Sequence, residues 1–131
     1  MRKTKAIFKS AWAYQKDEMN LPIPNLEEAL PFYEQIMGFG VRSKSISGLK
    51  PAVLTRDSIQ IGLSENGADP SQDGCFFEVD DVEAAFTELK SNGLNKENPD
   101  YKLENHGATS WRVFFIIAPD GLCYCLGERQ I

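Results

Sequence analysis

The chain repeats one pattern of strand and helix, and this repeat limits the folds that it can form. Residues 23–38 match residues 79–93, with apolar and alanine positions recurring 56 residues apart. Asn25 and Asp81 occupy equivalent positions, where a short polar side chain can cap the first turn of a helix. A glycine closes each segment and suits the left-handed position that follows a helix. Each segment is therefore typical of a strand end followed by a helix.

The sequence after each helix repeats as well. Residues 57–65 match residues 120–128 at a spacing of 63, and both combine a turn with alternating apolar residues. Alternation with a period of two is typical of a strand that buries one face. The sequence between helix and final strand has room for two more strands in each copy. These strands are expected at 40–46, 50–56, 101–104 and 110–118.

The repeat predicts an α+β fold of two βαβββ modules; that they pair as a curved mixed sheet around a groove is implied by the family resemblance given below. Module one spans 16–66 and module two spans 74–129, within a single domain over 16–129. Their two helices are expected at 26–37 and 82–92. The first helix contains a proline, Pro31, whose missing N–H should loosen or kink it.

Residues 1–15 form an N-terminal arm outside the repeat. The arm is rich in aromatic residues, which rarely stay in water on an extension. Ile7, Ala11 and Tyr14 would share one face of a helix, but the arm fits an extra strand equally well. We expect it to pack against a partner subunit or over the end of the groove.

Charge and hydropathy exclude several classes of partner. The chain carries a formal net charge of −5 and has a pI of about 4.9, so it repels phosphate backbones and anionic lipid. No apolar run approaches the roughly 20 residues that span a bilayer. Lys9 interrupts the only apolar run near the start, which is too short for a signal peptide. These features predict a cytoplasmic protein that binds neither nucleic acid nor membrane, and its 3 cysteines are expected to be free.

Three segments resemble the vicinal oxygen chelate superfamily, which includes glyoxalase I, the bleomycin resistance proteins and the extradiol dioxygenases. They are "LPIPNLEEALPFYEQIMGF", "FFEVDDVEAAFTELKSNG" and "WRVFFIIAPDG". Phe32, Tyr33, Gly38 and Phe39 have the spacing of the family's first motif, while Ala118 stands where the last motif usually has Asp. The resemblance implies that each module is a curved half-barrel sheet with its helix outside, and that two modules enclose a groove, often across a dimer.

The resemblance also identifies the positions of a metal centre. Metal enzymes of this superfamily take one ligand, usually His, Glu or Gln, from the first and last strand of each module. The corresponding positions are Glu18, Gly62, Gly74 and Cys125. The two glycines have no donor atoms, and two ligands fall short of the usual three or four. The only histidine, His106, matches no ligand position, so we expect neither metal nor cofactor.

Strand alternation predicts which residues of the last strand line the groove. With Leu122, Tyr124 and Leu126 toward the core, Cys123 and Cys125 face the groove, as lining thiols with no visible activating base. The full set of expected groove residues is Glu18, Gln60, Gly62, Phe76, Glu78, Tyr101, Trp111, Arg112, Phe114, Cys123 and Cys125.

Two pairs within this set allow a functional and a purely structural interpretation. Trp111 and Phe114 are either walls of a ligand site or ordinary core. Glu18 and Glu78 are either a pair of carboxylates facing one cavity or part of a solvated rim. The sequence alone does not separate these alternatives.

Two functions remain open. The missing metal ligands and the acidic pI favour a small-molecule-binding protein of the glyoxalase/bleomycin resistance type. The resemblance implies that such a protein sequesters an antibiotic-like or amphipathic ligand in the groove of a homodimer. The alternative is a lyase, isomerase or dioxygenase of the glyoxalase type, similar to a lactoylglutathione lyase. Fold does not decide between binding and catalysis.

Overall fold

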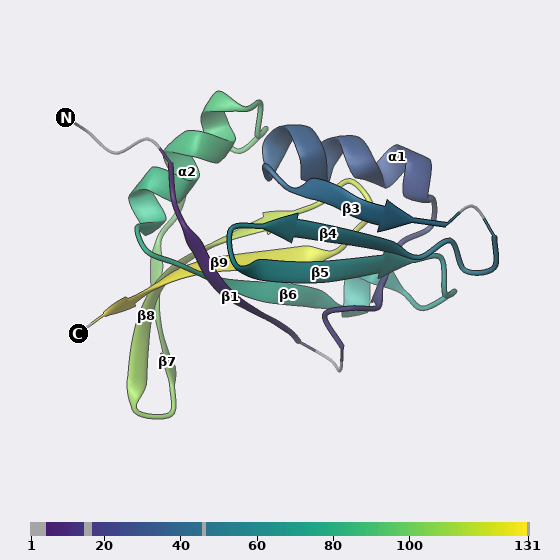
Figure 1. The fold of residues 1–131 in the computed structure, drawn as a ribbon. Helices are drawn as coiled ribbons and strands as arrows, with labels where there is room; N and C mark the ends of the chain where they lie inside the picture. Colours follow the sequence, from purple (N-terminus) through teal and green to yellow (C-terminus); the bar gives the residue numbers. More distant parts are fainter. Residues whose placement is uncertain (1–4, 15–16, 46, 131) are drawn as a thin grey trace.

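The computed structural model describes residues 5–14, 17–45 and 47–130. The chain forms two sheets, with two helices packed on one side of them (Figure 1). The strands are β1 (Phe8–Ala13), β2 (Leu21–Pro22), β3 (Gly40–Lys44), β4 (Ala52–Arg56), β5 (Ile59–Ser64), β6 (Gly74–Val79), β7 (Lys102–His106), β8 (Thr109–Ile117) and β9 (Cys123–Gln130). The helical segments are α1 (Leu26–Pro31), the π-helical turn η1 (Phe32–Ile36), the 3-10 turn η2 (Pro70–Gln72) and α2 (Val82–Ser91). Within the described ranges, no helix is both long and apolar enough to cross a bilayer.

Both sheets are mixed, and the repeat explains their register. The five-stranded sheet has the order β1-β6-β9-β8-β7, and the four-stranded sheet has the order β2-β5-β4-β3. Each contains one parallel pair, β6 with β9 and β2 with β5. Leu21 pairs with Leu63 in the first module, and the equivalent residues Phe77 and Leu126 pair in the second. The predicted α+β fold of βαβββ modules is therefore confirmed, as two sheets.

The two helices begin with the same side-chain cap. The Asn25 side chain accepts a hydrogen bond from the backbone N–H of Glu28 at 3.0 Å. The Asp81 side chain accepts one from the N–H of Ala84, also at 3.0 Å. Both bonds satisfy a backbone donor that has no partner within the helix. Asn25 and Asp81, which are equivalent in the sequence, therefore play the same helix-capping role.

A glutamate at the end of each module's last strand adds a second cap. Glu65 accepts from the N–H of Leu26 at 2.9 Å. Glu128 accepts from the N–H of Val82 at 2.8 Å. A carboxylate at this position is also stabilised by the positive end of the helix dipole. These bonds fix the start of each helix against the last strand of its own module.

The first helix changes type at its proline. Pro31 has no N–H to donate to the preceding turn, and the α-helix ends there. The chain continues as η1, and the N–H of Met37 reaches the carbonyl of Phe32, five residues back, at 3.1 Å. This spacing is that of a π-helix. The helix expected at 26–37 is present, with the disturbance that Pro31 predicted.

The described part of the N-terminal arm is a strand. β1 pairs antiparallel with β6, so that Trp12 lies opposite Phe76. Of the two conformations that the arm allowed, the extra strand is confirmed and the helix with Ile7, Ala11 and Tyr14 on one face is wrong. Residues 1–4 and 15 of the arm lie outside the described residues.

The two faces of the five-stranded sheet bury different clusters. Leu122, Tyr124 and Leu126 lie in the main core beneath the helices, together with Cys75. Cys125 belongs to a second, smaller cluster on the opposite face. The predicted alternation along β9 is confirmed.

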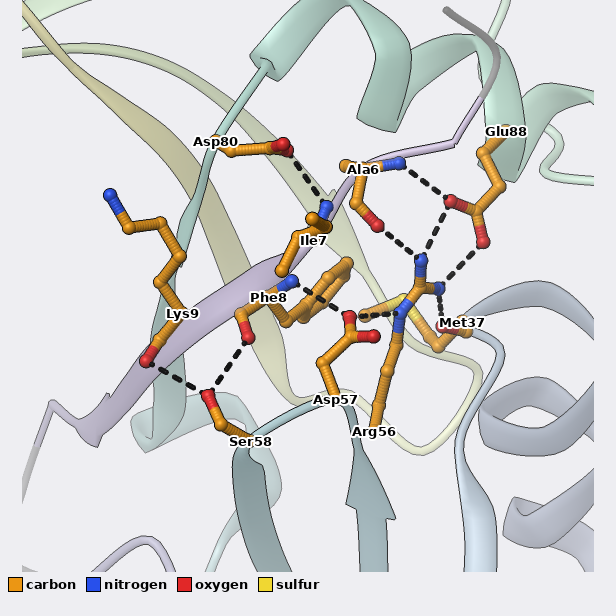
Figure 2. A network of polar contacts seen from close by, with 10 residues as sticks. All are labelled: Ala6, Ile7, Phe8, Lys9, Met37, Arg56, Asp57, Ser58, Asp80 and Glu88. Carbon is orange, nitrogen blue, oxygen red and sulfur yellow. Dashed lines mark hydrogen bonds and ion pairs between the residues drawn. The ribbon is translucent and has the colours of Figure 1, made fainter.

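A buried ion pair joins the two modules. Arg56 ends β4, and its two terminal nitrogens each lie 2.7 Å from a carboxylate oxygen of Glu88 on α2 (Figure 2). Both side chains are only 8% exposed. The same guanidinium donates to the carbonyl of Met37 at 2.6 Å and to that of Ala6 at 2.9 Å. A planar guanidinium can make such a bidentate pair and still serve other acceptors.

The same residues hold the arm in place. Glu88 accepts from the N–H of Ala6 at 3.1 Å, and Asp57 accepts from the N–H of Phe8 at 2.8 Å. The guanidinium of Arg56 lies 4.2 Å from the centre of the Phe8 ring. Figure 2 shows the start of β1 running beside this group. The start of β1 is thus fixed by residues of both modules.

A second polar contact links the modules inside the core. The Tyr33 hydroxyl donates to Asp120 at 2.8 Å and lies 2.6 Å from the Tyr124 hydroxyl. Burial raises the pKa of both tyrosines well above the usual value. Burial also raises the pKa of the Asp120 carboxyl. The two tyrosines therefore remain protonated and keep their role as hydrogen-bond donors.

We expect Glu88→Ala to destabilise the protein by about 3–5 kcal/mol, because it leaves the buried Arg56 cation without its partner. Urea unfolding followed by circular dichroism measures the change. The matched control is Glu27→Ala, which breaks an exposed pair with Lys44, 3.5 Å away, and should cost less than about 1 kcal/mol. Equal losses in the two variants would show that the Arg56–Glu88 pair does not hold the modules together.

Candidate functional site

The face of the five-stranded sheet opposite the main core carries a cluster of aromatic rings. Trp12 stacks on Phe76, with ring centres 4.5 Å apart and an interplanar angle of 13°. Trp111 meets both rings edge-on, at 6.0 Å from Trp12 and 5.1 Å from Phe76. The His106 ring lies 5.5 Å from Phe76. We call this surface the aromatic face and define it by Trp12, Phe76, His106 and Trp111.

Four strands of the sheet supply these rings, and a glycine lets them approach. Trp12 comes from β1, Phe76 from β6, Trp111 from β8 and His106 from β7. A Cβ on Gly127 of β9 would lie 2.5 Å from the Phe76 ring. Because β9 runs between β6 and β8, a side chain at Gly127 would force the rings apart. The small residue at this position therefore maintains the cluster.

The aromatic face combines exposed apolar surface with an unpaired donor. Trp12 is 38% exposed, whereas Phe76 and Trp111 are buried beneath it. Among the buried side-chain nitrogens and oxygens that the structure describes, only the indole Nε1 of Trp111 has no hydrogen-bond partner. A buried donor left unpaired costs about 1–3 kcal/mol. A ligand acceptor that reached this N–H would recover that cost.

Charged residues border the rings. Arg129 holds its guanidinium 5.3 Å from the centre of the Trp111 ring. Its Nε lies 3.9 Å from one carboxylate oxygen of Glu78, and the Lys9 ammonium lies 3.5 Å from the same oxygen. The other oxygen of Glu78 accepts from the Ser10 hydroxyl at 3.0 Å. The Glu78 carboxylate is thus already paired. Two further charges border the aromatic face: the cation of Arg129 and the carboxylate of Glu104, which lies 3.1 Å from Nε2 of His106.

The two glutamates that the sequence singled out lie in different surroundings. Glu78 is buried in β6, within the polar group just described. Glu18 lies in the turn before β2, where its backbone carbonyl accepts from the N–H of Gly62 at 2.8 Å. Glu78, with Lys9 and Arg129, can orient a ligand at the rim. Because its carboxylate is already paired with these two cations, it is not free to bind a cationic ligand.

The positions that correspond to a metal centre do not fit a metal ion. A Cβ on Gly62 would collide with the main chain of Met19. A Cβ on Gly74 would collide with the carbonyl of Cys123 and would lie 2.6 Å from the Tyr14 ring. Neither position has room for a ligating side chain, whatever the residue type.

The remaining two candidates do not complete a site. Burial, followed by the nearby Glu104, raises the pKa of the Cys125 thiol well above its usual value, so the thiolate that would bind a metal is disfavoured. Among the residues with described placement, no three His, Cys, Asp or Glu side chains lie close enough to hold a metal ion. We therefore derive no reaction step through a metal.

Several predicted groove residues lie on the other face of the sheet. Phe114 is buried in the main core and packs edge-on against Phe86. Arg112 donates to Glu83 at 2.5 Å and lies 4.1 Å from the centre of the Tyr101 ring. Residues three apart on a strand point to opposite faces, so Phe114 cannot share a wall with Trp111. Phe114, Arg112 and Tyr101 are therefore not brought together with the aromatic face.

Gln60 and Cys123, two further predicted residues, do not join the rings. Gln60 on β5 accepts from Arg42 at 2.9 Å. Cys123 is half-buried at the start of β9, and burial raises the pKa of its thiol. A neutral thiol is a poor nucleophile. Both residues can contribute neutral, weakly polar surface.

Sequence reasoning missed three residues of this site. Trp12 lies in the arm outside the repeat, His106 matches no metal-ligand position, and Arg129 belongs to no motif of the sequence. The alternation of Ser10, Trp12 and Tyr14 was the available signal, because it places their side chains on one face of a strand. No local pattern identifies β6 as the neighbour of that strand.

Comparison with known proteins supports this architecture. The family model described as the Glyoxalase/Bleomycin resistance protein/Dioxygenase superfamily matches residues 16–121. No curated protein matches the chain. Among solved structures, the bleomycin resistance determinant encoded on the transposon Tn5 is 22% identical, with a TM-score of 0.61 over 89% of this chain and 99% of that one.

Two further solved structures have the same fold. TnmS3, an antibiotic binding protein from Streptomyces sp. CB03234, is 18% identical, with a TM-score of 0.62 over 85% of this chain and 92% of that one. VPC_CASS1, from the mobile metagenome of V. Pseudocholerae, is 19% identical, with a TM-score of 0.64 over 89% and 95% of the two chains. The structural likeness and the family match agree. The chain belongs to the Glyoxalase/Bleomycin resistance protein/Dioxygenase superfamily.

Proposed function

We propose that the chain is a small-molecule-binding protein that holds an apolar or amphipathic, antibiotic-like ligand on the aromatic face. The observation that carries this proposal is the combination of a partly exposed Trp12 with the unpaired buried N–H of Trp111. The first offers a surface for stacking, and the second is a directional donor that a ligand acceptor can pair with when the side chains covering it move. Sites of this composition, mostly apolar with a few polar groups, suit small molecules.

The geometry favours a planar ligand with a hydrogen-bond acceptor. The stacked rings of Trp12 and Phe76 form a flat base, and aromatic faces bury a large area at low conformational cost. Arg129 places a positive charge beside the Trp111 ring. A ligand whose acceptor or anionic group lies at that end would satisfy both the indole N–H and the guanidinium.

The comparisons are consistent with a binding role. The solved structures with this fold include one named as an antibiotic binding protein and one named as a bleomycin resistance determinant. Because these two proteins have low sequence identity to this chain, they support its fold alone. The proposal for its ligand is argued from the chain's own residues. Catalysis of the glyoxalase type gains no support from the four metal positions, because two of them have no room for a side chain.

We expect truncation of Trp12, the exposed ring of the aromatic face, to weaken ligand binding about 5- to 150-fold, since an aromatic wall contributes on the order of 1–3 kcal/mol when a ligand buries it. A compound found by screening planar molecules would be titrated by calorimetry against Trp12→Ala. Tyr101→Ala is the matched control, because Tyr101 is an aromatic residue that contacts Arg112 away from the aromatic face. If both variants bind as tightly as the parent while remaining folded, the site does not lie on the aromatic face.

We also expect the purified protein to bind no Zn, Ni, Mn or Fe in the micromolar range. The reason is the collision of any side chain at Gly62 or Gly74 with the main chain. Calorimetric titration with each ion and elemental analysis provide the measurement. Tight binding of one ion per chain that is lost in Glu18→Ala would show that the assignment of the ligand positions is wrong.

The ligand site is proposed to lie in a homodimer. Trp12 and Tyr14 remain partly exposed on one end of the sheet, and a second copy would cover them and close a groove over the aromatic face. We expect sedimentation equilibrium to give twice the chain mass of 14.7 kDa at micromolar concentration. A monomer throughout that range would contradict the dimer and leave the rings as an open surface site.

A further inference from the structure

A cavity lies away from the four rings, between residues of the two modules. It has a volume of about 530 Å³, within the range of roughly 300–1,000 Å³ that is typical of small-molecule sites. Phe32 and Ile36 of η1 form one wall, and Phe115 and Ile117 of β8 form the other. Leu94, in the loop after α2, closes one end. We call this cavity the junction pocket.

The walls of the junction pocket are fixed by hydrogen bonds. The side chain of Asn92 donates to the carbonyl of Ile36 at 3.0 Å and ties the α2 end to η1. The N–H groups of Gly93 and Leu94 return to the last turn of α2, at 3.1 Å and 2.9 Å. The carbonyls of that helix end therefore have partners. A pre-formed cavity binds with less loss of conformational freedom than one that must be assembled.

Apolar surface in this cavity is left in contact with water. Ile117 is 72% exposed although it lies in a nine-residue strand. Phe115 is half-buried and also packs against the smaller cluster under the aromatic face. An apolar ligand in the junction pocket would remove part of both side chains from water.

The polar end of the pocket carries a positive charge. Lys96 is the charged residue among its lining residues. Among the described residues, its ammonium pairs with Asp100 alone, at 4.0 Å, and the Asp100 side chain is 75% exposed. An exposed pair at this distance contributes little. Cys123, also in the lining, is neutral because burial raises the pKa of its thiol. The electrostatics of the pocket therefore suit an anionic group beside Lys96.

We propose that the junction pocket binds an amphiphile with an apolar chain and an anionic head, such as a medium-chain carboxylate. The chain lies between η1 and β8, and the carboxylate pairs with Lys96. This site is separate from the ligand site of the proposed function and does not depend on it. Because its walls come from both modules, an occupied pocket also resists their separation.

The test uses decanoate below its micelle concentration, with decyltrimethylammonium as the probe of opposite charge. Titration of ¹⁵N-labelled protein, followed by NMR, should show saturable decanoate binding with shifts at Leu94, Lys96 and Ile117. Decyltrimethylammonium should bind at least about five-fold more weakly, since the head group faces a cation. Shifts confined to the indole groups of Trp12 and Trp111 would place the amphiphile on the aromatic face and overturn the proposal.

Two variants with matched controls test the residues. Lys96→Glu should weaken decanoate binding about five- to ten-fold, whereas Lys90→Glu makes the same charge change on α2 outside the pocket and should leave binding unchanged. Ile117→Ala should weaken binding about two- to five-fold. Its control is Leu103→Ala, a residue of β7 that is equally exposed, at 74%. Equal effects in variant and control, or no saturable binding at all, would show that the junction pocket is not an amphiphile site.

Discussion

The bidentate pair of Arg56 and Glu88 is the interaction on which the arrangement of the chain depends. It is buried, and it joins the end of β4 in module one to α2 in module two. Two buried charges are stable only when each has its partner, so the pair fixes the distance between the modules. The same group holds the N–H of Phe8 through Asp57. The start of β1 is thereby set, and β1 carries Trp12 onto Phe76.

The two modules share their capping and register but differ on the face that would bind a ligand. In module one the main chain at Met19 lies against Gly62 and leaves no room for a side chain. In module two the equivalent strand carries Cys125, in a buried cluster covered by the partly exposed ring of Trp12. The face is therefore closed by main chain in module one and covered by aromatic rings in module two. A symmetric metal centre needs donors from both modules, whereas a stacked ligand needs only one open face.

The sequence predicts the elements well because caps, turns and alternation are local. The equivalence of Asn25 with Asp81 follows from spacing alone, whereas the pairing of their modules is implied by the family resemblance. The site is less predictable, because it depends on long-range contacts. Alternation separates Trp111 from Phe114, yet the pairing of β1 with β6 decides that Trp12 joins Trp111. No local pattern pairs Arg56 with Glu88.

The most direct measurement is the NMR signal of the two indole N–H groups during a ligand titration. Trp12→Phe assigns each resonance, because the chain has 2 tryptophans. We expect both signals to shift along the binding curve, and the Trp111 signal to move downfield as its unpaired N–H gains an acceptor. A compound that binds tightly while both indole signals stay unmoved would contradict a ligand site on the aromatic face.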